Sequence, residues 1–456
     1  MCAHTLPASR ILALALAFSS AACSGGGDSA PPQAPAFDPC VWTPWPTNPV
    51  IASGWTAPGD LLINDPCVIA EGAGYRMWYS KGTGLGINHV KVYQGTSIDG
   101  TSWALDPAVL VESSSDVTVT GTTTPDVAGI FELIGENASD FTNGRPAFEL
   151  QAGGWFLWYD PAWLHYRISD ALGADGTASW LGSGGTIIDG AFAPHSGAAS
   201  GAPDATSEWD SEKVETPMVL KVASTYHLYY SGFKVGDSPG AYDTGHATSP
   251  DGTVWTKDPN NPVLVGGSDP AQFGFYQAAE PGVVFNPVDS TFYAYYVTAR
   301  DRGPQYAGTD LALQQGIAVA TSVDGSTFTF QQMSLTQSAA YPVAMSYVGY
   351  STPFALIDSV GTFHLLYDVA QYAGPGDWRQ VALAHATSSD GLTFTEVETD
   401  IFVFQDVPWR THEVRAPCVI EENDIFKMWF AGSNSLFFQP GFTFDIGYAT
   451  SDKVCR

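Results

Sequence analysis

The sequence predicts an all-β protein whose folded part is a single β-propeller, a ring of four-stranded blades. Three observations lead to this prediction. One strand motif recurs six times, each copy is long enough to supply a four-stranded sheet, and the last copy lacks a strand that the N-terminal region provides. The composition agrees, because 47 Gly, 31 Pro and 13% aromatic residues are typical of many short strands joined by turns.

The N-terminal region is expected to direct export rather than to join the fold. Residues 1–22 have Arg10 followed by a short apolar run, which is typical of a signal peptide and too short to span a bilayer. Small residues precede Cys23, as in the lipobox of bacterial lipoproteins, so we expect this cysteine to be lipidated. Residues 23–39 then form a flexible linker and residues 40–456 the propeller. A lipid alone would anchor the protein to a bacterial membrane, in the periplasm or at the cell surface.

The repeated motif is a proline followed by an apolar run and, after a turn, an aromatic-rich strand. In the third copy, residues 226–230 read Tyr-His-Leu-Tyr-Tyr, a pattern that suits a half-buried strand. The prolines recur every 64 to 80 residues. The six copies begin at Asp65-Pro66, Arg145-Pro146, Thr216-Pro217, Glu280-Pro281, Thr352-Pro353 and Ala416-Pro417.

A second motif, Ser-Xaa-Asp-Gly followed by an aromatic residue, comes after four of the six copies. It occupies residues 96–103, 248–255, 321–328 and 387–394. Asp-Gly between apolar strands predicts a hairpin, and the trailing aromatic residue can pack between sheets. The second copy has only a looser version, at residues 174–180. We therefore count six blades, with a five-bladed core as the alternative, in which the second unit is an insertion.

The two ends of the chain are expected to close the ring. The sixth repeat stops before its last strand, whereas residues 42–54 resemble residues 255–267, which end the third repeat. The N-terminal strand would complete the last blade and cover an otherwise open edge. Export and lipidation leave four cysteines, which allow three pairings. We predict the disulfides Cys40–Cys455, at the closure, and Cys67–Cys418, just after the first and sixth prolines.

The net charge of −29 restricts the partners of the protein. A surface this acidic repels phosphate backbones, so nucleic acid is not an expected partner. The sequence also carries no P-loop and no dinucleotide-binding fingerprint. We expect a monomer that needs no cofactor and no metal, with a structural calcium ion as the one exception left open.

The residues just before each proline are expected to converge on one mouth of the central channel, because the Xaa-Pro step begins the innermost strand. The charged residues at these steps are Asp65, Glu215, Glu280, Arg145 and Arg415. The carboxylates are candidate catalytic groups. The arginines are candidates for binding the substrate or for neutralising the acids. His412 and Glu413 lie just upstream and are further candidates for substrate contact.

These steps resemble the motifs of the glycoside hydrolase propellers, the clan that includes families 32, 43 and 68. Asn64-Asp65-Pro66 is similar to their N-D-P motif and Glu215-Thr216-Pro217 to their E-x-P motif, and the resemblance covers most of residues 40–456. It implies that Asp65 is the nucleophile or base and Glu215 the general acid, with Glu280 as a rival. Two departures stand out. Arg145 occupies the place of a second-blade Asp, and those enzymes have five blades.

The chemistry that this resemblance implies is hydrolysis of glycosidic bonds in an oligo- or polysaccharide by two carboxyls in unlike environments. In a six-bladed ring, Asp65 lies two blades from Glu215 and opposite Glu280. Both arrangements favour the wider spacing of inverting enzymes. The alternative is a non-catalytic propeller lipoprotein that binds carbohydrate or protein, which the missing second-blade Asp favours.

Overall fold

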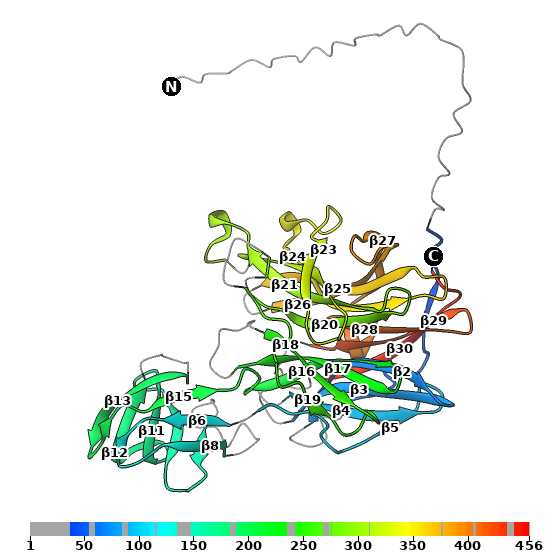
Figure 1. Cartoon of the computed structure of the whole chain (residues 1–456). Coiled ribbons are helices and arrows are strands. Elements are labelled where there is room, and N and C mark those ends of the chain that lie inside the picture. The colour runs from blue at the N-terminus through cyan, green and yellow to red at the C-terminus, as the bar shows by residue number, and fades with distance from the viewer. Residues whose placement is uncertain are drawn as a thin grey trace, which may run out of the picture. The chain divides into compact units, whose positions relative to one another are not determined.

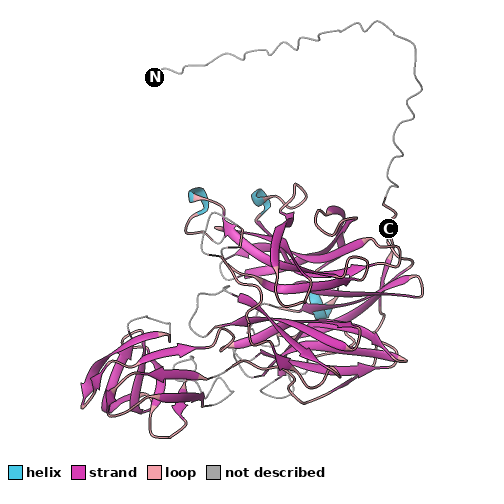
Figure 2. Cartoon of the chain, viewed as in Figure 1, coloured by secondary structure: helices cyan, strands magenta, loops and turns pink. Residues whose placement is uncertain are grey.

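The computed structural model of the chain is built almost wholly of β-strands (Figures 1 and 2). It describes residues 37–53, 60–83, 90–114, 116–134, 147–182, 188–234, 242–267, 273–274, 276–309, 311–374, 377–404, 407–435 and 442–455. The predicted signal peptide and the lipidation site Cys23 lie outside these residues. Within them, no helix combines the length and the apolar character that crossing a bilayer requires.

The described residues form five four-stranded antiparallel blades, each with its first strand innermost and in contact with the first strands of its neighbours. Blade 1 holds β2 (Asp60–Glu71), β3 (Gly74–Thr83), β4 (Val90–Ser97) and β5 (Trp103–Leu105). Blade 2 holds β16 (Lys213–Val222), β17 (Thr225–Phe233), β18 (Tyr242–Ser249) and β19 (Thr256–Lys257). Blade 3 holds β20 (Ala279–Asn286), β21 (Thr291–Asp301), β22 (Leu313–Ser322) and β23 (Thr329–Thr336). Blade 4 holds β24 (Tyr347–Ile357), β25 (Phe363–Gly374), β26 (Asp377–Ser388) and β27 (Thr395–Val403). Blade 5 holds β28 (Glu413–Glu422), β29 (Ile425–Ser433), β30 (Phe444–Ser451) and β1 (Trp42–Pro44). Short 3-10 helices lie in the connections, at η3 (Pro304–Tyr306), η4 (Val343–Met345) and η5 (Pro408–Arg410).

The second repeat is not a blade, so the count of six is wrong and the five-bladed alternative is right. Its strands close into a separate eight-stranded barrel, inserted between blades 1 and 2 and coloured cyan to green in Figure 1. The barrel has its own core, which includes Phe131, Leu157 and Trp180, all fully buried. The barrel strands are β6 (Val117–Thr120), β8 (Gly129–Leu133), β9 (Phe148–Leu150), β10 (Phe156–Asp160), β11 (His165–Ala171), β12 (Ala174–Gly182), β13 (Gly190–Gly197) and β15 (Asp204–Ser207). A further pair joins β7 (Thr123–Thr124) to β14 (Ser200–Gly201). The region predicted as a propeller, residues 40–456, therefore contains this barrel as well as the blades.

Recurring hydrogen bonds between blades explain why the two sequence motifs occur together. An aromatic residue of the second strand donates to the glycine carbonyl of the Asp-Gly turn in the next blade. Trp78 Nε1 reaches Gly252 (3.2 Å), and Trp429 Nε1 reaches Gly100 (2.8 Å). Tyr229 and Tyr295 hydroxyls bond Gly325 and Gly391 in the same way, at 2.6 and 2.7 Å. Because Trp78 reaches blade 2, blades 1 and 2 are direct neighbours in the ring.

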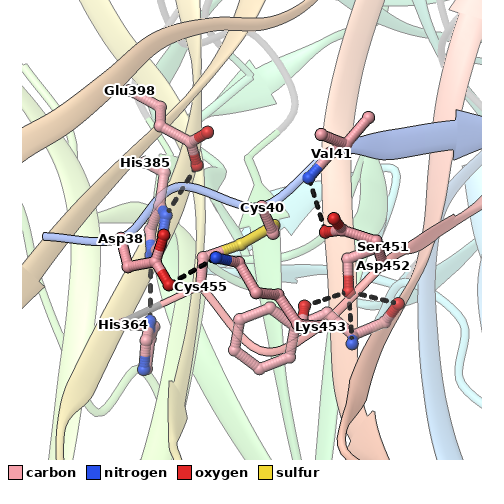
Figure 3. Close-up of a disulfide and its surroundings, with 11 residues drawn as sticks. Asp38, Cys40, Val41, His364, His385, Glu398, Ser451, Asp452, Lys453 and Cys455 are labelled. Carbon is pink, nitrogen blue, oxygen red and sulfur yellow. Dashed lines mark hydrogen bonds and ion pairs between the residues drawn. A yellow bond between two sulfur atoms is a disulfide. The ribbon is translucent and has the colours of Figure 1, made fainter.

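The ring closes as the sequence predicts, with the N-terminal strand in the last blade. Trp42 pairs with Ser451, and Pro44 pairs with Ala449. The disulfide Cys40–Cys455 lies beside this strand, next to a hydrogen bond from Val41 N to Asp452 Oδ1 of 2.7 Å (Figure 3). It joins residues 415 positions apart. Cross-linking so long a loop stabilises the fold by about 6 kcal/mol in the chain-entropy model.

The second predicted disulfide is wrong, because Cys67 and Cys418 are buried free thiols in the structure. Each sulfur accepts a hydrogen bond from the backbone of the next blade instead. Cys418 Sγ accepts from Val68 N (3.0 Å), and Cys67 Sγ accepts from Val219 N (3.1 Å). Both thiols thus bond in the same direction around the ring. They join neighbouring inner strands through a hydrogen bond rather than a covalent bond.

Candidate active site

Every inner strand has an irregular step at its proline, and this step aims the side chains before it into the channel. The ladder with the second strand shifts there in all five blades. The residue before each proline has a positive φ: 51° at Asp65, 54° at Thr216, 52° at Glu280, 38° at Thr352 and 52° at Ala416. Such a backbone costs about 1–2 kcal/mol per residue outside glycine, and strain of this kind gathers at functional sites.

Side chains from the preceding blade satisfy the backbone amides that these bulges free. Thr216 N donates to Ser80 Oγ (2.9 Å), and Glu280 N donates to Ser231 Oγ (2.7 Å). Thr352 N donates to Glu280 Oε2 (2.9 Å). The strained residues are therefore fixed from the neighbouring blade, so side chains at the channel mouth are held in place before any ligand arrives.

The mouth of the channel is a pocket of about 430 Å³, as the convergence of the Xaa-Pro steps predicts. Asp65, Glu215, Glu280 and Arg415 all line it. The other described lining residues are Leu62, Asn64, Val90, Lys213, Tyr242, Gln277, Ala279, Gln315 and Gln380. The pocket thus joins charged groups with several side-chain amides, drawn from all five blades.

Asp65 is buried, with only 6% of its surface exposed. Ser80 Oγ donates to its Oδ2 at 2.9 Å, whereas its buried Oδ1 has no hydrogen-bond partner among the described residues. Burial raises the pKa of Asp65 to about 6, against the opposing charge of Arg415, and the nearby Glu215 carboxylate adds to the rise. Asp65 is thus a basic carboxylate with one free oxygen in the pocket.

Glu215 forms an ion pair with Lys213, whose Nζ lies 3.2 Å from Glu215 Oε2. Lys213 is buried, and its ammonium lies 4.9 Å from the centre of the Tyr242 ring. Burial alone would lower the pKa of Lys213, but the Glu215 carboxylate and Tyr242 raise it. Glu215 and Lys213 therefore form an ion pair that lines the pocket.

Arg415 is the centre of a buried cluster of acids. Its Nη2 donates to Glu280 Oε1 at 3.3 Å, and its charge also acts on Asp65, Asp368 and Glu413. Burial raises the pKa of Glu280 to about 7 and that of Glu413 to about 7, with Arg415 opposing both rises. The single positive charge of Arg415 is thus opposed by four carboxyl groups.

Several polar atoms in the pocket have no hydrogen-bond partner among the described residues although they are buried. The acceptors are Asn64 Oδ1, Asp65 Oδ1, Gln315 Oε1 and Gln380 Oε1, and the donor is Arg415 Nε. Buried polar atoms are normally paired, so an unpaired group of them in one pocket marks a place where a ligand or water completes the bonding. A ligand rich in hydroxyl groups would supply the donors that these acceptors lack.

The remaining predicted site residues are not part of the lining. His412 bonds Asp377 Oδ1 through its Nε2 at 3.0 Å. Glu413 is buried, with 1% of its surface exposed, and accepts a hydrogen bond from Ser433 Oγ at 3.4 Å. Arg145 lies outside the described residues.

The spacing of the blades also corrects the expected geometry. Asp65 and Glu215 lie in neighbouring blades rather than two blades apart. Asp65 and Glu280 lie two blades apart rather than opposite. Both errors follow from counting the barrel as a blade.

Sequence reasoning missed Lys213, Gln277, Tyr242, Gln315 and Gln380. Lys213 and Gln277 were open to prediction, because each lies four residues before a proline and residues two apart in an extended chain face the same side. The other three begin or lie near the start of the third strands, where no motif marks the channel side.

The described residues offer one group of metal-ligand type outside the pocket, Cys40, Glu398 and Cys455, with donor atoms within 4.8 Å of one another. Both sulfurs are joined in the disulfide, so this group does not fit a metal ion.

Comparison with known proteins places the fold. No protein-family model matches the chain. A solved structure of a complex of BT0996 and RGII has a TM-score of 0.51 at 13% identity, and the match covers 92% of this protein and 94% of that one. One described as "Glycoside hydrolase" has a TM-score of 0.50 at 14% identity, covering 89% and 91%. A glycosyl hydrolase from Bacteroides ovatus also reaches 0.50, at 12% identity, covering 91% and 94%. The chain therefore shares its fold with these three structures.

Two curated proteins from strains of Mycobacterium tuberculosis, both uncharacterized, match part of the sequence. Each is 27% identical over 193 residues, which is 41% of this chain. The chain spans about half the length of these relatives, 52% in each case.

Proposed function

We propose that the protein hydrolyses glycosidic bonds, with Asp65 as the base and Glu280 as the general acid. The observation that carries this proposal is a pair of carboxyls with raised pKa values in one pocket, about 6 for the buried Asp65 and about 7 for the partly buried Glu280. Between these values Asp65 is mostly ionised and Glu280 mostly protonated. That is the division of roles that glycoside hydrolysis requires.

The five-bladed count supports the same assignment. In the family that the sequence resembles, the first-blade Asp is the nucleophile or base and the third-blade Glu is the acid. With the barrel removed from the count, Glu280 is the third-blade Glu and Glu215 belongs to blade 2. Glu280, the rival in the sequence prediction, thus replaces Glu215 as the proposed acid. Glu215 takes the place of the auxiliary carboxylate, so the expected departure at Arg145 no longer counts against activity.

The roles of the neighbouring groups follow from their charges. The Glu215 carboxylate, paired with Lys213, would stabilise the positive charge that develops on the sugar ring. Arg415 would keep Asp65 and Glu280 in place. Because Asp65 and Glu280 lie two blades apart, we expect the wider carboxyl separation of an inverting enzyme, with Asp65 activating a water molecule.

The test is a hydrolysis screen of oligosaccharides with wild type, Asp65→Asn, Glu280→Gln and Glu215→Gln side by side. We expect both Asp65→Asn and Glu280→Gln to lose activity on unactivated glycans. Only Glu280→Gln should be rescued by a nitrophenol leaving group, which needs no protonation. Proton NMR of the first-formed product would show the inverted anomer. Hydrolysis that is unchanged in Asp65→Asn contradicts the proposal.

A non-catalytic propeller that binds carbohydrate is the second candidate. The unpaired amide oxygens of Asn64, Gln315 and Gln380 favour it, since they suit ligand binding whether or not a bond is cleaved. Binding of a glycan without turnover by the wild type would support this candidate over hydrolysis.

The expected lipid anchor at Cys23 remains a proposal of its own. Metabolic labelling with a palmitate analogue should mark the wild type and not Cys23→Ser, and labelling of both would contradict it.

A further inference from the structure

We propose that the pocket holds one terminal, uncharged sugar unit, so that the protein trims glycans from their ends. This inference rests on the proposed function and adds the mode of action and the substrate class to it. Three features of the pocket carry the inference: its closed floor, its charge balance and its unpaired acceptors.

The floor of the pocket is closed by the Xaa-Pro steps themselves. Beneath the mouth, the five prolines Pro66, Pro217, Pro281, Pro353 and Pro417 ring a space of only about 40 Å³, together with Met218 and Phe354. A space of this size holds a water molecule or two and no sugar. A glycan therefore cannot thread through the channel from one end to the other.

The volume of the mouth supports the same conclusion. About 430 Å³ lies at the small end of the range for pockets that enclose small ligands. Asp65 and Glu280 both line the narrow space beneath the mouth as well as the mouth itself. The proposed reacting groups therefore lie at the bottom of the pocket. A sugar that reaches them lies at the end of its chain.

The charge balance argues against an acidic sugar. The two cations among the described lining residues are Lys213 and Arg415. Lys213 is paired with Glu215, and Arg415 with Glu280, while Asp65 carries a further negative charge at the same mouth. A carboxylate on the incoming sugar would face these acids. Arg415 Nε has no hydrogen-bond partner among the described residues, but the charge of that guanidinium is already opposed by Glu280.

The unpaired acceptors indicate what the pocket binds instead. Asn64 and Asp65 present them from blade 1, Gln315 from blade 3 and Gln380 from blade 4, so they surround the space from several sides. Hydroxyl groups around a sugar ring can donate to all of them at once, whereas a carboxylate is only an acceptor. The pocket is thus suited to a hydroxylated, neutral ring.

The first test follows the products of cleavage over time. Tetrasaccharides of glucose, galactose, mannose, xylose and arabinose, labelled with a fluorophore at the reducing end, are incubated with the wild type and with Asp65→Asn. We expect the labelled trisaccharide to appear first, then the disaccharide. Early release of shorter labelled fragments would overturn the end-on mode while leaving hydrolysis itself intact.

The second test compares matched nitrophenyl hexosides and hexuronides, which differ only in the oxidation of one carbon. We expect kcat/KM for the hexuronide to be lower by about 100-fold or more. In Gln380→Lys, which places a cation among the acceptors, the hexuronide should regain about tenfold relative to the hexoside. Equal rates on the two substrates in the wild type would overturn the charge argument.

A binding measurement separates this inference from the proposed function. Saturation-transfer NMR with the same unlabelled tetrasaccharides reports which rings contact the protein. Contact confined to the terminal ring, without any cleavage, would refute hydrolysis and uphold the pocket assignment. Contact spread over internal rings would refute the pocket assignment. Neither cleavage nor binding of any neutral tetrasaccharide would overturn both.

Discussion

The two ends of the propeller channel are built from the same five strands, and they differ in almost every property. Before each proline, the strands present acids, amides, Lys213 and Arg415 to the mouth. After it, residues such as Val68, Val219 and Val283 line an apolar hollow of about 630 Å³ at the base. The proline step is therefore the boundary between the polar mouth, where we propose that catalysis occurs, and the apolar base, whose side chains pack the fold. Four predictions test how sharp that boundary is.

The largest expected effect is on catalysis at the mouth. Asp65→Asn should lower kcat/KM by about 10³-fold, because the amide cannot act as a base. Glu71→Gln is the matched control, since Glu71 lies on the same strand β2 but at the base, where it pairs with Arg76 at 2.9 Å. That pair is partly exposed to solvent and is not part of the lining of the mouth, so activity should stay within about twofold. Equal losses in the two variants would show that the proline step is no boundary.

The pH dependence of activity should also belong to the mouth alone. Below pH 6 Asp65 gains the proton that disables it as a base, and above pH 7 Glu280 loses the proton that it must donate. We expect a bell-shaped profile of kcat/KM with apparent pKa values near 6 and 7. On a nitrophenyl glycoside, Glu280→Gln should lose the alkaline limb and keep the acid one. An alkaline limb that persists in this variant would assign the acid to another group.

Stability should respond in opposite directions at the two ends. The pKa of Asp65 is about 6 in the fold and 3.8 in the unfolded chain, so the unfolded chain releases its proton first as the pH rises. Stability from this group is present below pH 4 and is lost as the pH rises through 6. Asp65→Asn should therefore raise the free energy of unfolding by about 1–3 kcal/mol at pH 8 and leave it nearly unchanged at pH 4.

The matched change at the base is Val283→Ala, at a residue 1% exposed. It should lower the free energy of unfolding by about 2 kcal/mol at both pH values and leave kcat/KM unchanged. Urea unfolding at pH 4 and pH 8 measures both variants. A loss of stability at pH 8 in Asp65→Asn would mean that the mouth, too, is built for stability.

The blades could be predicted from the sequence, because two local motifs, the aromatic strand and the Asp-Gly turn, recur along the chain and bond each other between neighbouring blades. The aromatic strand and the Asp-Gly turn meet in the structure through bonds such as Trp78 to Gly252. The ring closure was likewise predictable, since the last repeat lacked a strand and residues 42–54 supplied it. Local motifs did not reveal the barrel. Its repeat has a proline, an aromatic strand and a turn, but those strands pair among themselves.

The site was predicted in part for the same reason. Asp65, Glu215, Glu280 and Arg415 share a position relative to a proline, and the structure brings all four to one pocket. Their relative placement was wrong, because one extra blade changes every angle around a ring. The second disulfide failed on a finer point. Cys67 and Cys418 occupy equivalent positions in neighbouring blades, but each sulfur accepts a backbone hydrogen bond from the next blade and both thiols stay free.

The smallest expected effect is on the stability of the apolar end of the channel at acidic pH. His227 pairs across the sheet with Leu220, which lines the hollow. Its Nδ1 lies 3.1 Å from His246 Nε2, and His246 Nδ1 lies 3.2 Å from Asp258 Oδ2. Burial, with the neighbouring His246, lowers the pKa of His227 to about 4 from 6.5 in the unfolded chain. Stability from this group is therefore full above pH 6.5 and is lost as the pH falls toward 4.

His227→Gln should remove this dependence while keeping a side chain that can bond His246. Between pH 7 and pH 5, the variant should lose about 1–2 °C less in Tm than the wild type, measured by calorimetry. His412→Gln, whose histidine bonds Asp377 beside the acid cluster, controls for histidine loss in general. If the two variants behave alike, the acid sensitivity is not a property of the base. If only His227→Gln responds, low pH destabilises the apolar end of the channel through His227, whereas high pH destabilises the mouth through Asp65. The fold is then most stable at a pH where both His227 and Asp65 are uncharged.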